Sequence, residues 1–240
     1  MTEPLAYPCA LRRLSVVRHG QSSANVVFAR AAETGDPALS VPEPCDAVVP
    51  LSPLGVEQAR AAGRWLGGLA AADRPDVVVC SPYLRAVQTW EAMAEAAGRT
   101  APAPAPAGAL LDERLRDREM GVLELLTPAA MRERAPEEAA RRLRVGDRSY
   151  RPPGGESSAD VTLRVRDFLG ELSGSAPPRA HVLLVAHDAV VLAVRQVLSG
   201  IGAPDPGPVE IPNASVSRWD GDGTRMRLAE FAAVGHLPEP

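Results

Sequence analysis

Three short apolar runs, each followed at once by polar residues capable of chemistry, stand out in the pattern of hydrophobic and polar positions. They cover residues 14–17, 76–80 and 182–186 and are rich in valine and leucine. The residues that follow them are Arg18-His19-Gly20, the segment from Ser81 to Arg85, and His187-Asp188. Short apolar runs bounded by turn residues are typical of strands buried on both faces, as in a parallel sheet.

Amphipathic segments typical of helices lie between and after these runs. Ser52-Pro53 begins one of them, because serine suits the N-cap and proline the first helical position. Ser81-Pro82 repeats that pattern and places Arg85 in a first helical turn. The predicted helices cover 53 to about 69, 82 to about 97, 157 or 158 to about 172, and 189 to about 198 with Asp188 as cap. Strands alternating with helices predict a three-layer α/β/α fold with one mostly parallel central sheet.

Two segments interrupt this alternation. Residues 100–109 are rich in proline and alanine, which favours an extended surface connection. Residues 112–151 carry 10 arginines and nine acidic residues among 40 positions, so we expect a charged excursion with short helices, one of them near 136–143.

Composition narrows the function classes. The chain has 240 residues, and its net charge of −4 favours neither nucleic acid nor an anionic membrane as a partner. All 26 basic residues are arginine, which excludes Schiff-base and Walker A chemistry because both need lysine. The N-terminal residues lack a signal-peptide pattern and the three cysteines lack a metal-ligand spacing, so we expect a cytoplasmic protein.

The polar residues after the apolar runs are expected to meet at one edge of the sheet. Ligands of open parallel sheets bind beyond the carboxyl ends of the strands, which would bring together Arg18, His19, Arg85 and His187. Arginine matches a phosphate dianion bidentately, and imidazole can act as a nucleophile. Each residue alone would suit a cap or a surface position, but the threefold repetition favours a phosphate site. His181 and His236 are expected to be structural.

The motifs around these residues resemble those of the histidine phosphatase superfamily, also called phosphoglycerate mutase-like. The matching pieces are Val17 to Ser22 with Asn25, Pro50 to Gly55 with Gln58-Ala59, Ser81 to Ala86 with Gln88-Thr89, and Val185 to His187. The resemblance implies a phosphohistidine at His19, with Arg18, Arg85, Asn25 and His187 holding the phosphoryl oxygens. It makes Gln21 and Ser22 substrate-binding candidates, and it implies no metal and no cofactor. We expect one domain over 1–240, with an excursion at about 100–155 that covers the active site.

The acid that would protonate the leaving group is the point where the sequence departs from the family pattern. The family has a glutamate four residues before a glycine, and here Asp117 stands four residues before Gly121. Glu119 is the alternative, because residues two apart in extended backbone share one side. Asp117 is favoured on position. Either must be partly protonated to act as an acid, so we expect an optimum below neutral pH.

The middle of the chain resembles the bisphosphatase domain of fructose-2,6-bisphosphatase. The similar pieces are 121–127, 136–138, 150–157, 160–161 and 187–190. The resemblance makes Tyr150 and Arg151 candidates for contacting a second phosphate, although Asp188 replaces a neutral residue of that family. It favours a small phosphorylated metabolite as the substrate.

Three other interpretations stay open at this point. A cofactor-dependent phosphoglycerate mutase would show a tryptophan after the nucleophile motif and a Glu-Arg-His-Tyr-Gly segment, and both are absent. A non-catalytic member would normally have lost one of the site histidines or arginines. A protein phosphatase acting on phosphohistidine or phosphotyrosine would usually lack the long excursion. The oligomeric state is not determined by the sequence, and a homodimer is one possibility.

Overall fold

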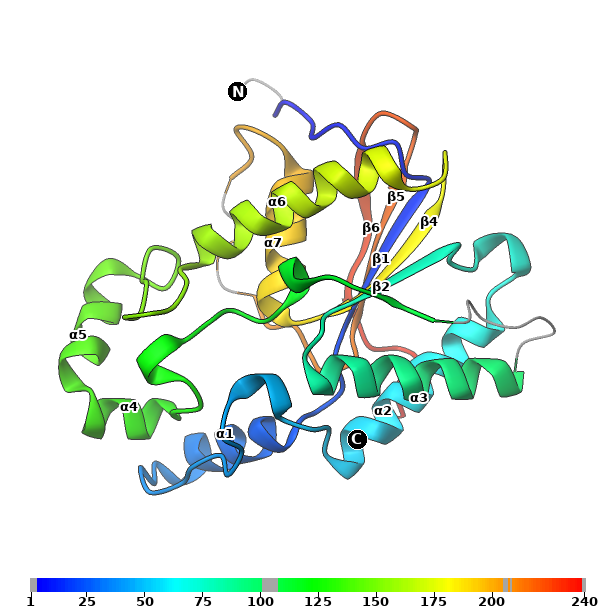
Figure 1. Cartoon of the computed structure of the whole chain (residues 1–240). Helices are drawn as coiled ribbons and strands as arrows, with labels where there is room; N and C mark the ends of the chain where they lie inside the picture. The colour runs from blue at the N-terminus through cyan, green and yellow to red at the C-terminus, as the bar shows by residue number, and fades with distance from the viewer. Residues whose placement is uncertain (1–3, 101–107, 205–206, 208, 239–240) are drawn as a thin grey trace.

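The three apolar runs form neighbouring strands of one central sheet (Figure 1). The computed structural model describes residues 4–100, 108–204, 207 and 209–238. Within these residues the strands are β1 (Arg13–Arg18), β2 (Val77–Cys80), β3 (Leu110–Leu111), β4 (His181–Ala186), β5 (Val216–Gly221) and β6 (Met226–Ala233). Their order across the sheet is β3-β2-β4-β1-β5-β6. β1, β2, β3 and β4 pair in parallel, whereas β5 pairs antiparallel with both β1 and β6. The predicted mostly parallel sheet is confirmed.

Helices cover both faces of this sheet. The described α-helices are α1 (Ser23–Thr34), α2 (Pro53–Gly68), α3 (Leu84–Thr100), α4 (Pro128–Arg134), α5 (Pro136–Val145), α6 (Ser158–Ser175) and α7 (Asp188–Ser199). α2 and α3 pack on one face, while α6 and α7 pack on the other (Figure 1). Among the described residues, no helix combines the length and the apolar character needed to span a bilayer.

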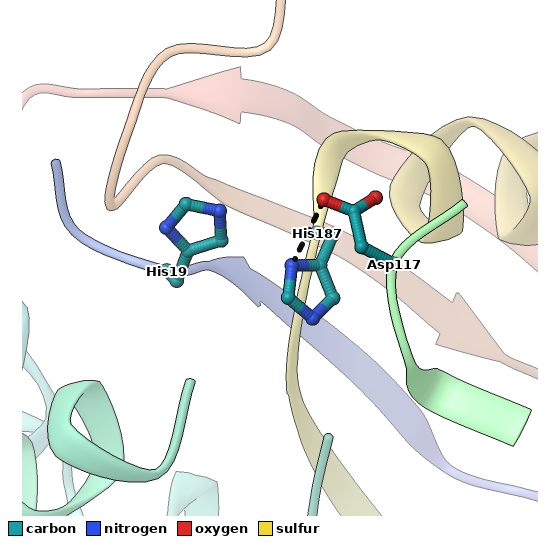
Figure 2. A group of neighbouring side chains, drawn as sticks. All are labelled: His19, Asp117 and His187. Atoms are coloured by element: carbon teal, nitrogen blue, oxygen red, sulfur yellow. Dashed lines mark ion pairs between the residues drawn. The ribbon is translucent and has the colours of Figure 1, made fainter. Parts of the chain in front are cut away.

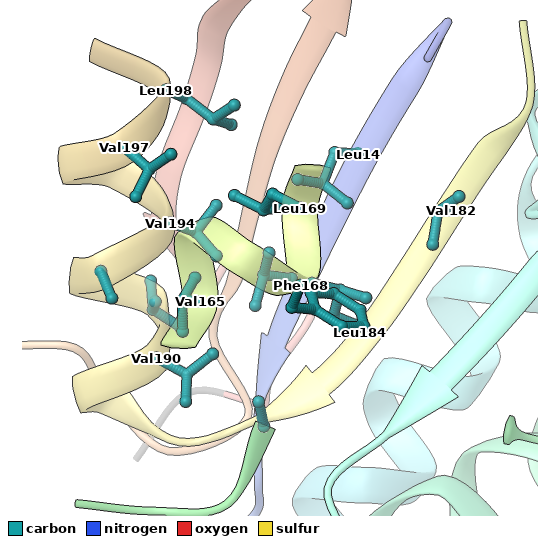
Figure 3. Packing of buried hydrophobic residues seen from close by; sticks show 14 of the residues in the cluster. Leu14, Val165, Phe168, Leu169, Val182, Leu184, Val190, Val194, Val197 and Leu198 are labelled. Atoms are coloured by element: carbon teal, nitrogen blue, oxygen red, sulfur yellow. The ribbon is translucent and has the colours of Figure 1, made fainter. Parts of the chain in front are cut away.

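β4 shows why its apolar run is continuous. Val182 and Leu184 point into the core under α6 and α7, where they meet Val165 and Phe168 (Figure 3). Leu183 and the other alternate residues of β4 point to the opposite core, under α2 and α3. Successive strand residues face opposite sides, so a strand covered on both faces needs apolar residues throughout. Every residue of β4 is buried.

Two predicted helix starts are wrong in detail. α3 begins at Leu84 rather than at Pro82, because the Ser81 hydroxyl contacts His187 Nε2 at 2.8 Å instead of capping the helix. α7 begins at Asp188 itself, with His187 in the N-cap position, so Asp188 is not the cap. The Asp188 carboxylate instead lies 3.5 Å from the Arg18 guanidinium.

The charged excursion is built from short elements. It contains the 3-10 helices η3 (Glu113–Leu115) and η4 (Gly121–Leu123), followed by α4 and α5, and α5 matches the helix predicted near 136–143. Leu123, Met131 and Tyr150 form a small apolar cluster of its own. Most of the predicted extended connection, residues 101–107, lies outside the described part of the chain.

The two histidines expected to be structural contact main-chain carbonyl oxygens, and neither lines the cavity described below. His181 begins β4, and its Nδ1 lies 2.9 Å from the carbonyl oxygen of Asp73. Its Nε2 lies 2.9 Å from the Ser15 hydroxyl. His236 Nε2 lies 3.0 Å from the carbonyl oxygen of Ala214.

The loop after β1 is fixed by a close approach of two glycines. A Cβ on Gly20 would lie 2.3 Å from the carbonyl oxygen of Gly55, and a Cβ on Gly55 would lie 2.0 Å from that of Gln21. These distances leave no room for a side chain. The first turn of α2 therefore rests directly on the backbone that follows His19.

Gly55→Ala is expected to destabilise the protein by about 2 kcal/mol or more, because the added methyl group forces two backbone segments apart. Gly68→Ala is the matched control in the same helix, since a Cβ there meets nothing within 4 Å. It should change stability by less than about 1 kcal/mol. Urea unfolding of both variants measures this, and equal effects would contradict the close contact.

Candidate active site

A cavity of about 970 Å³ opens at the carboxyl ends of β1, β2 and β4. Arg18 and His19 come from the end of β1, Arg85 from the first turn of α3, and Asp117 from the segment after η3. His187 follows β4, and its ring centroid lies 5.0 Å from that of His19. Figure 2 shows the two rings and the Asp117 carboxylate gathered in one place. The parallel sheet thus brings together the four residues that the strand pattern selected.

His19 is held with its ring proton on one particular nitrogen. Its Nδ1 lies 2.7 Å from the carbonyl oxygen of Gly20. A carbonyl oxygen can only accept, so Nδ1 carries the proton and Nε2 carries the lone pair. Burial, followed by the charges of Arg85, His187 and Arg18, lowers the pKa of His19 well below its usual range. The ring is therefore neutral near pH 7, and Nε2 can act as a nucleophile.

His187 is fully buried behind the cavity, with one ring nitrogen close to Asp117. The main-chain N–H of Tyr83 donates to the Ser81 hydroxyl at 3.3 Å, which leaves that hydroxyl free to donate its own proton to His187 Nε2 at 2.8 Å. Nδ1 then carries the ring proton and lies 3.3 Å from Asp117 Oδ2. In the described structure this buried Nδ1 forms no hydrogen bond of good geometry. Apart from this contact with Asp117, the N–H is available as a donor beside His19.

The two arginines supply permanent positive charge. Arg18 donates Nη1 to the carbonyl oxygen of Ile211, while its buried Nε has no partner among the described residues. The Arg85 side chain is 4% exposed, and its Nε donates to His19 Nε2 at 3.2 Å. The unpaired buried Nε of Arg18 and the positive charges of the two arginines form a site that suits an anion.

Asp117 lies closer to the two histidines than Glu119 does. Asp117 Oδ2 accepts a hydrogen bond from Arg85 Nη2 at 2.8 Å. A carboxylate oxygen of Asp117 and one ring nitrogen of each histidine lie within 4.8 Å of one another. Glu119 lines the cavity, but its carboxylate is held by Tyr83 at 3.3 Å and by Arg116 at 3.1 Å. Burial raises the pKa of Asp117, but its interactions with His187 and Arg85 outweigh burial and hold the pKa well below its usual range.

Asp46 is a cavity residue that the sequence reasoning missed. It is the first residue of the 3-10 helix η1 (Asp46–Val48), in an irregular segment between α1 and α2. Its carboxylate accepts two hydrogen bonds from Arg85, both of 2.9 Å. No periodicity or motif marks the position. The one available signal is the presence of an acid shortly before the matched Pro50 to Gly55 segment.

The other candidates from the nucleophile motif divide into two groups. Ser22 and Asn25 line the cavity, and Ser22 caps α1. Asn25 Oδ1 accepts hydrogen bonds from the main-chain N–H of Ser22 and from Asn213 Nδ2, the latter at 3.1 Å. The amide nitrogen of Asn25 is therefore the atom that can donate to a ligand. Gln21 does not line the cavity, because its side chain accepts from Ser52 at 2.7 Å and holds the start of α2.

Tyr150 and Arg151 lie away from the cavity, contrary to the expectation drawn from the bisphosphatase resemblance. Tyr150 is fully buried and donates to Glu138 at 2.7 Å. The Arg151 side chain is 62% exposed and pairs with Asp160. Neither residue lines the cavity, because these local partners hold both side chains elsewhere.

A metal ion is poorly suited to the histidine pair. His19, Asp117 and His187 offer ligand atoms within 4.8 Å of one another. Arg85, however, donates to both His19 Nε2 and Asp117 Oδ2. A guanidinium at this position repels a cation and occupies the lone pairs that a metal would use. We therefore interpret the group as part of an anion site.

The fold places an unpaired buried arginine donor and two histidines at the carboxyl edge of a mostly parallel sheet, an arrangement that suits an anion. The model of the histidine phosphatase superfamily (branch 1) matches residues 14–233. The chain therefore belongs to this family.

Relatives named for different activities are similarly distant from this chain. The chain is 31% identical over 211 residues to a 2,3-bisphosphoglycerate-dependent phosphoglycerate mutase of Rhizobium etli, covering 84% of this chain and 87% of the mutase. It is 31% identical over 194 residues to a glucosyl-3-phosphoglycerate phosphatase of Mycobacterium tuberculosis, covering 78% of this chain and 75% of the phosphatase. The mycobacterial glucosyl-3-phosphoglycerate phosphatase solved with VO3 superimposes with a TM-score of 0.71 at 31% identity, over 93% of this chain and 100% of that one.

Arg18→Ala is expected to lower kcat/KM for p-nitrophenyl phosphate by about 100-fold or more, because it removes a positive charge and an unpaired buried Nε donor from the cavity. Arg151→Ala is the control that tests the placement of Arg151 outside the cavity, and it should change kcat/KM by less than about threefold. Steady-state kinetics on both variants measures this. A large loss in Arg151→Ala would restore that residue to substrate binding.

Proposed function

We propose that the protein is a metal-independent phosphomonoesterase that acts through a phosphohistidine at His19. The observation that carries the proposal is the neutral His19 ring, with the unpaired donor Arg18 Nε, His187 Nδ1 and the Arg85 guanidinium gathered around it. These donors surround the place where the charge of a transferring phosphoryl group would develop.

The proposed reaction has two steps. In the first, the His19 Nε2 lone pair attacks phosphorus, the bond from phosphorus to the ester oxygen breaks, and Asp117 gives its proton to that oxygen. In the second, water attacks the phosphohistidine, Asp117 takes a proton from the water, and the phosphorus–nitrogen bond breaks. His19 is regenerated neutral, and inorganic phosphate leaves.

Asp117 is proposed as the acid and base in preference to Glu119. Its carboxylate is 3.3 Å from His187 Nδ1, whereas the Glu119 carboxylate is engaged by Tyr83 and Arg116. Asp117 acts from the small fraction that is protonated on the acid side of neutrality, because its pKa is held well below its usual range. Glu119 is then a substrate-binding residue at the wall of the cavity.

The proposed substrate is a small phosphorylated metabolite such as a sugar phosphate or a phosphoglycerate. Arg118 and Arg142 line the cavity, and the Arg118 guanidinium donates to the main-chain oxygens of Tyr150 and Glu156. Arg142 pairs with Asp147, and the carboxylates of Glu119 and Glu124 also line the cavity, so a wall of mixed charge favours a substrate with further polar groups. We propose that the excursion at about 100–155 covers the active site of a single domain. The cytoplasmic location and the oligomeric state stay predictions.

A phosphoglycerate mutase is the second candidate, because the Rhizobium etli relative is a mutase of similar identity. A mutase returns the phosphoryl group to a substrate hydroxyl, whereas a phosphatase gives it to water. The same nucleophile would serve both reactions, so only a product assay separates them.

Inorganic phosphate is expected from at least one ester in a panel of 3-phosphoglycerate, glucosyl-3-phosphoglycerate, fructose 2,6-bisphosphate, nucleotides and phosphotyrosine. EDTA should leave the rate intact, since arginines supply the positive charge, and His19→Ala should abolish it. Conversion of 3- to 2-phosphoglycerate in the presence of 2,3-bisphosphoglycerate, without phosphate release, would establish the mutase instead. Strict dependence on Mg²⁺ would contradict the mechanism.

The pH optimum of kcat/KM is expected below neutral. The lowered pKa of His19, due to burial and nearby arginines, keeps the nucleophile neutral well below pH 6.5. Because the pKa of Asp117 is lowered, its carboxyl group is mostly ionised near neutral pH, and acidification increases the protonated fraction that can act as an acid. Both effects favour the reactive form on the acid side of neutrality. A pH profile with a flat or alkaline optimum would exclude a carboxylic acid in this role.

A further inference from the structure

The Arg85 guanidinium is fully engaged by protein groups. Nε donates to His19 Nε2 at 3.2 Å. Nη1 donates to the main-chain oxygen of Asp46 at 2.7 Å and to Asp46 Oδ1 at 2.9 Å. Nη2 donates to Asp46 Oδ2 at 2.9 Å and to Asp117 Oδ2 at 2.8 Å. Arginine has five N–H hydrogens, so each has an acceptor. A phosphoryl group can bind Arg85 only by displacing one of these partners.

Asp46 occupies Arg85 as a phosphate would. Its two carboxylate oxygens accept from the two Nη atoms, the fork-to-fork arrangement by which arginine binds planar or tetrahedral oxyanions. The side chain is 21% exposed and lines the proposed phosphoryl cavity. The main-chain N–H of Asp46 donates to Glu124 at 2.7 Å, so the backbone of η1 is fixed while the carboxylate faces the ligand space.

The groups around Asp46 make its displacement costly while it is charged. From the other elements it faces Asp117, Tyr83, Glu124 and His187, besides Arg85. A phosphoryl dianion on Arg85 would leave the Asp46 carboxylate beside Asp117 and the dianion, without its guanidinium partner. A buried charge that has lost its partner is strongly unfavourable, and a carboxylate relieves that cost by taking a proton.

We propose that Asp46 is an internal occupant of the phosphoryl site, which the substrate dianion displaces from Arg85 and which then takes up one proton from solvent. The proposal rests on the phosphoryl site of the proposed function. The binding step is balanced as free enzyme, ester dianion and one proton giving a complex with neutral Asp46, and no covalent bond changes.

Asp46 is better placed than Asp117 to take this proton. Asp117 keeps His187 Nδ1 at 3.3 Å when Arg85 turns to a ligand, whereas Arg85 is the cation that holds the Asp46 carboxylate. Consistently, burial raises the pKa of Asp46 even with Arg85 against it, and the Asp117 charge acts in the same direction. The geometry and the charge balance therefore select the same residue.

Sulfate is the probe for this proposal, because it is a tetrahedral dianion that does not titrate near neutral pH. Calorimetric titration at one pH in two buffers of different ionisation enthalpy gives the protons taken up per sulfate. We expect about one proton in the wild-type protein, with affinity falling about tenfold per pH unit in the alkaline range. Sulfate binding without proton uptake would overturn the proposal and leave the proposed function standing.

Three variants assign the proton to a residue. Asp46→Asn should remove the uptake and make sulfate binding independent of pH, whereas Asp117→Asn should retain the uptake. Asp188→Asn is the matched control, because Asp188 is a second cavity carboxylate beside an arginine, at 3.5 Å from Arg18. It should also retain the uptake.

The remaining outcomes contradict the proposal. Loss of uptake in Asp117→Asn or Asp188→Asn, with uptake kept in Asp46→Asn, would move the proton to another carboxylate. Uptake kept in all three variants would assign it to a histidine. Failure of the wild-type protein to bind sulfate or a phosphate ester would overturn both this proposal and the proposed function.

Discussion

The buried charge of Arg85 is the constraint around which the site is organised. A guanidinium that is 4% exposed must be surrounded by acceptors, since an unpaired charge in the interior would be prohibitively costly. These acceptors come from parts of the chain that are distant in sequence: the loop after β1, η1 and the segment after η3. Arg85 therefore fixes the positions of His19, Asp46 and Asp117 relative to one another, as well as the charge of the cavity.

The sheet provides the frame in which this charge can be buried. β1, β4 and β2 lie side by side and point the same way, so their carboxyl ends deliver an arginine, two histidines and the start of α3 to one edge. The carbonyl oxygen of Gly20 then sets the tautomer of His19, because it holds the ring proton on Nδ1. The close contact of Gly20 with Gly55 fixes the same loop from below.

The central strands and the residues at their carboxyl ends could be predicted from the sequence, because strands buried on both faces give continuous apolar runs. The apolar run of β4 and the residue that ends it, His187, follow from the same physical requirement. Asp46 could not be predicted, because it lies in an irregular segment 39 residues from Arg85 and meets it only through tertiary packing. Tyr150 and Arg151 were misplaced because local pairs with Glu138 and Asp160 hold them away, which no motif reveals.

The apolar cluster of Leu123, Met131 and Tyr150 is separate from the two cores that flank the sheet. The segment that forms the cavity wall therefore has its own packing and does not rely on the side chains that position His19. Substitutions within this cluster are expected to leave the packing behind β1 and His19 intact. The packing of this part of the wall and that of the sheet can therefore vary independently.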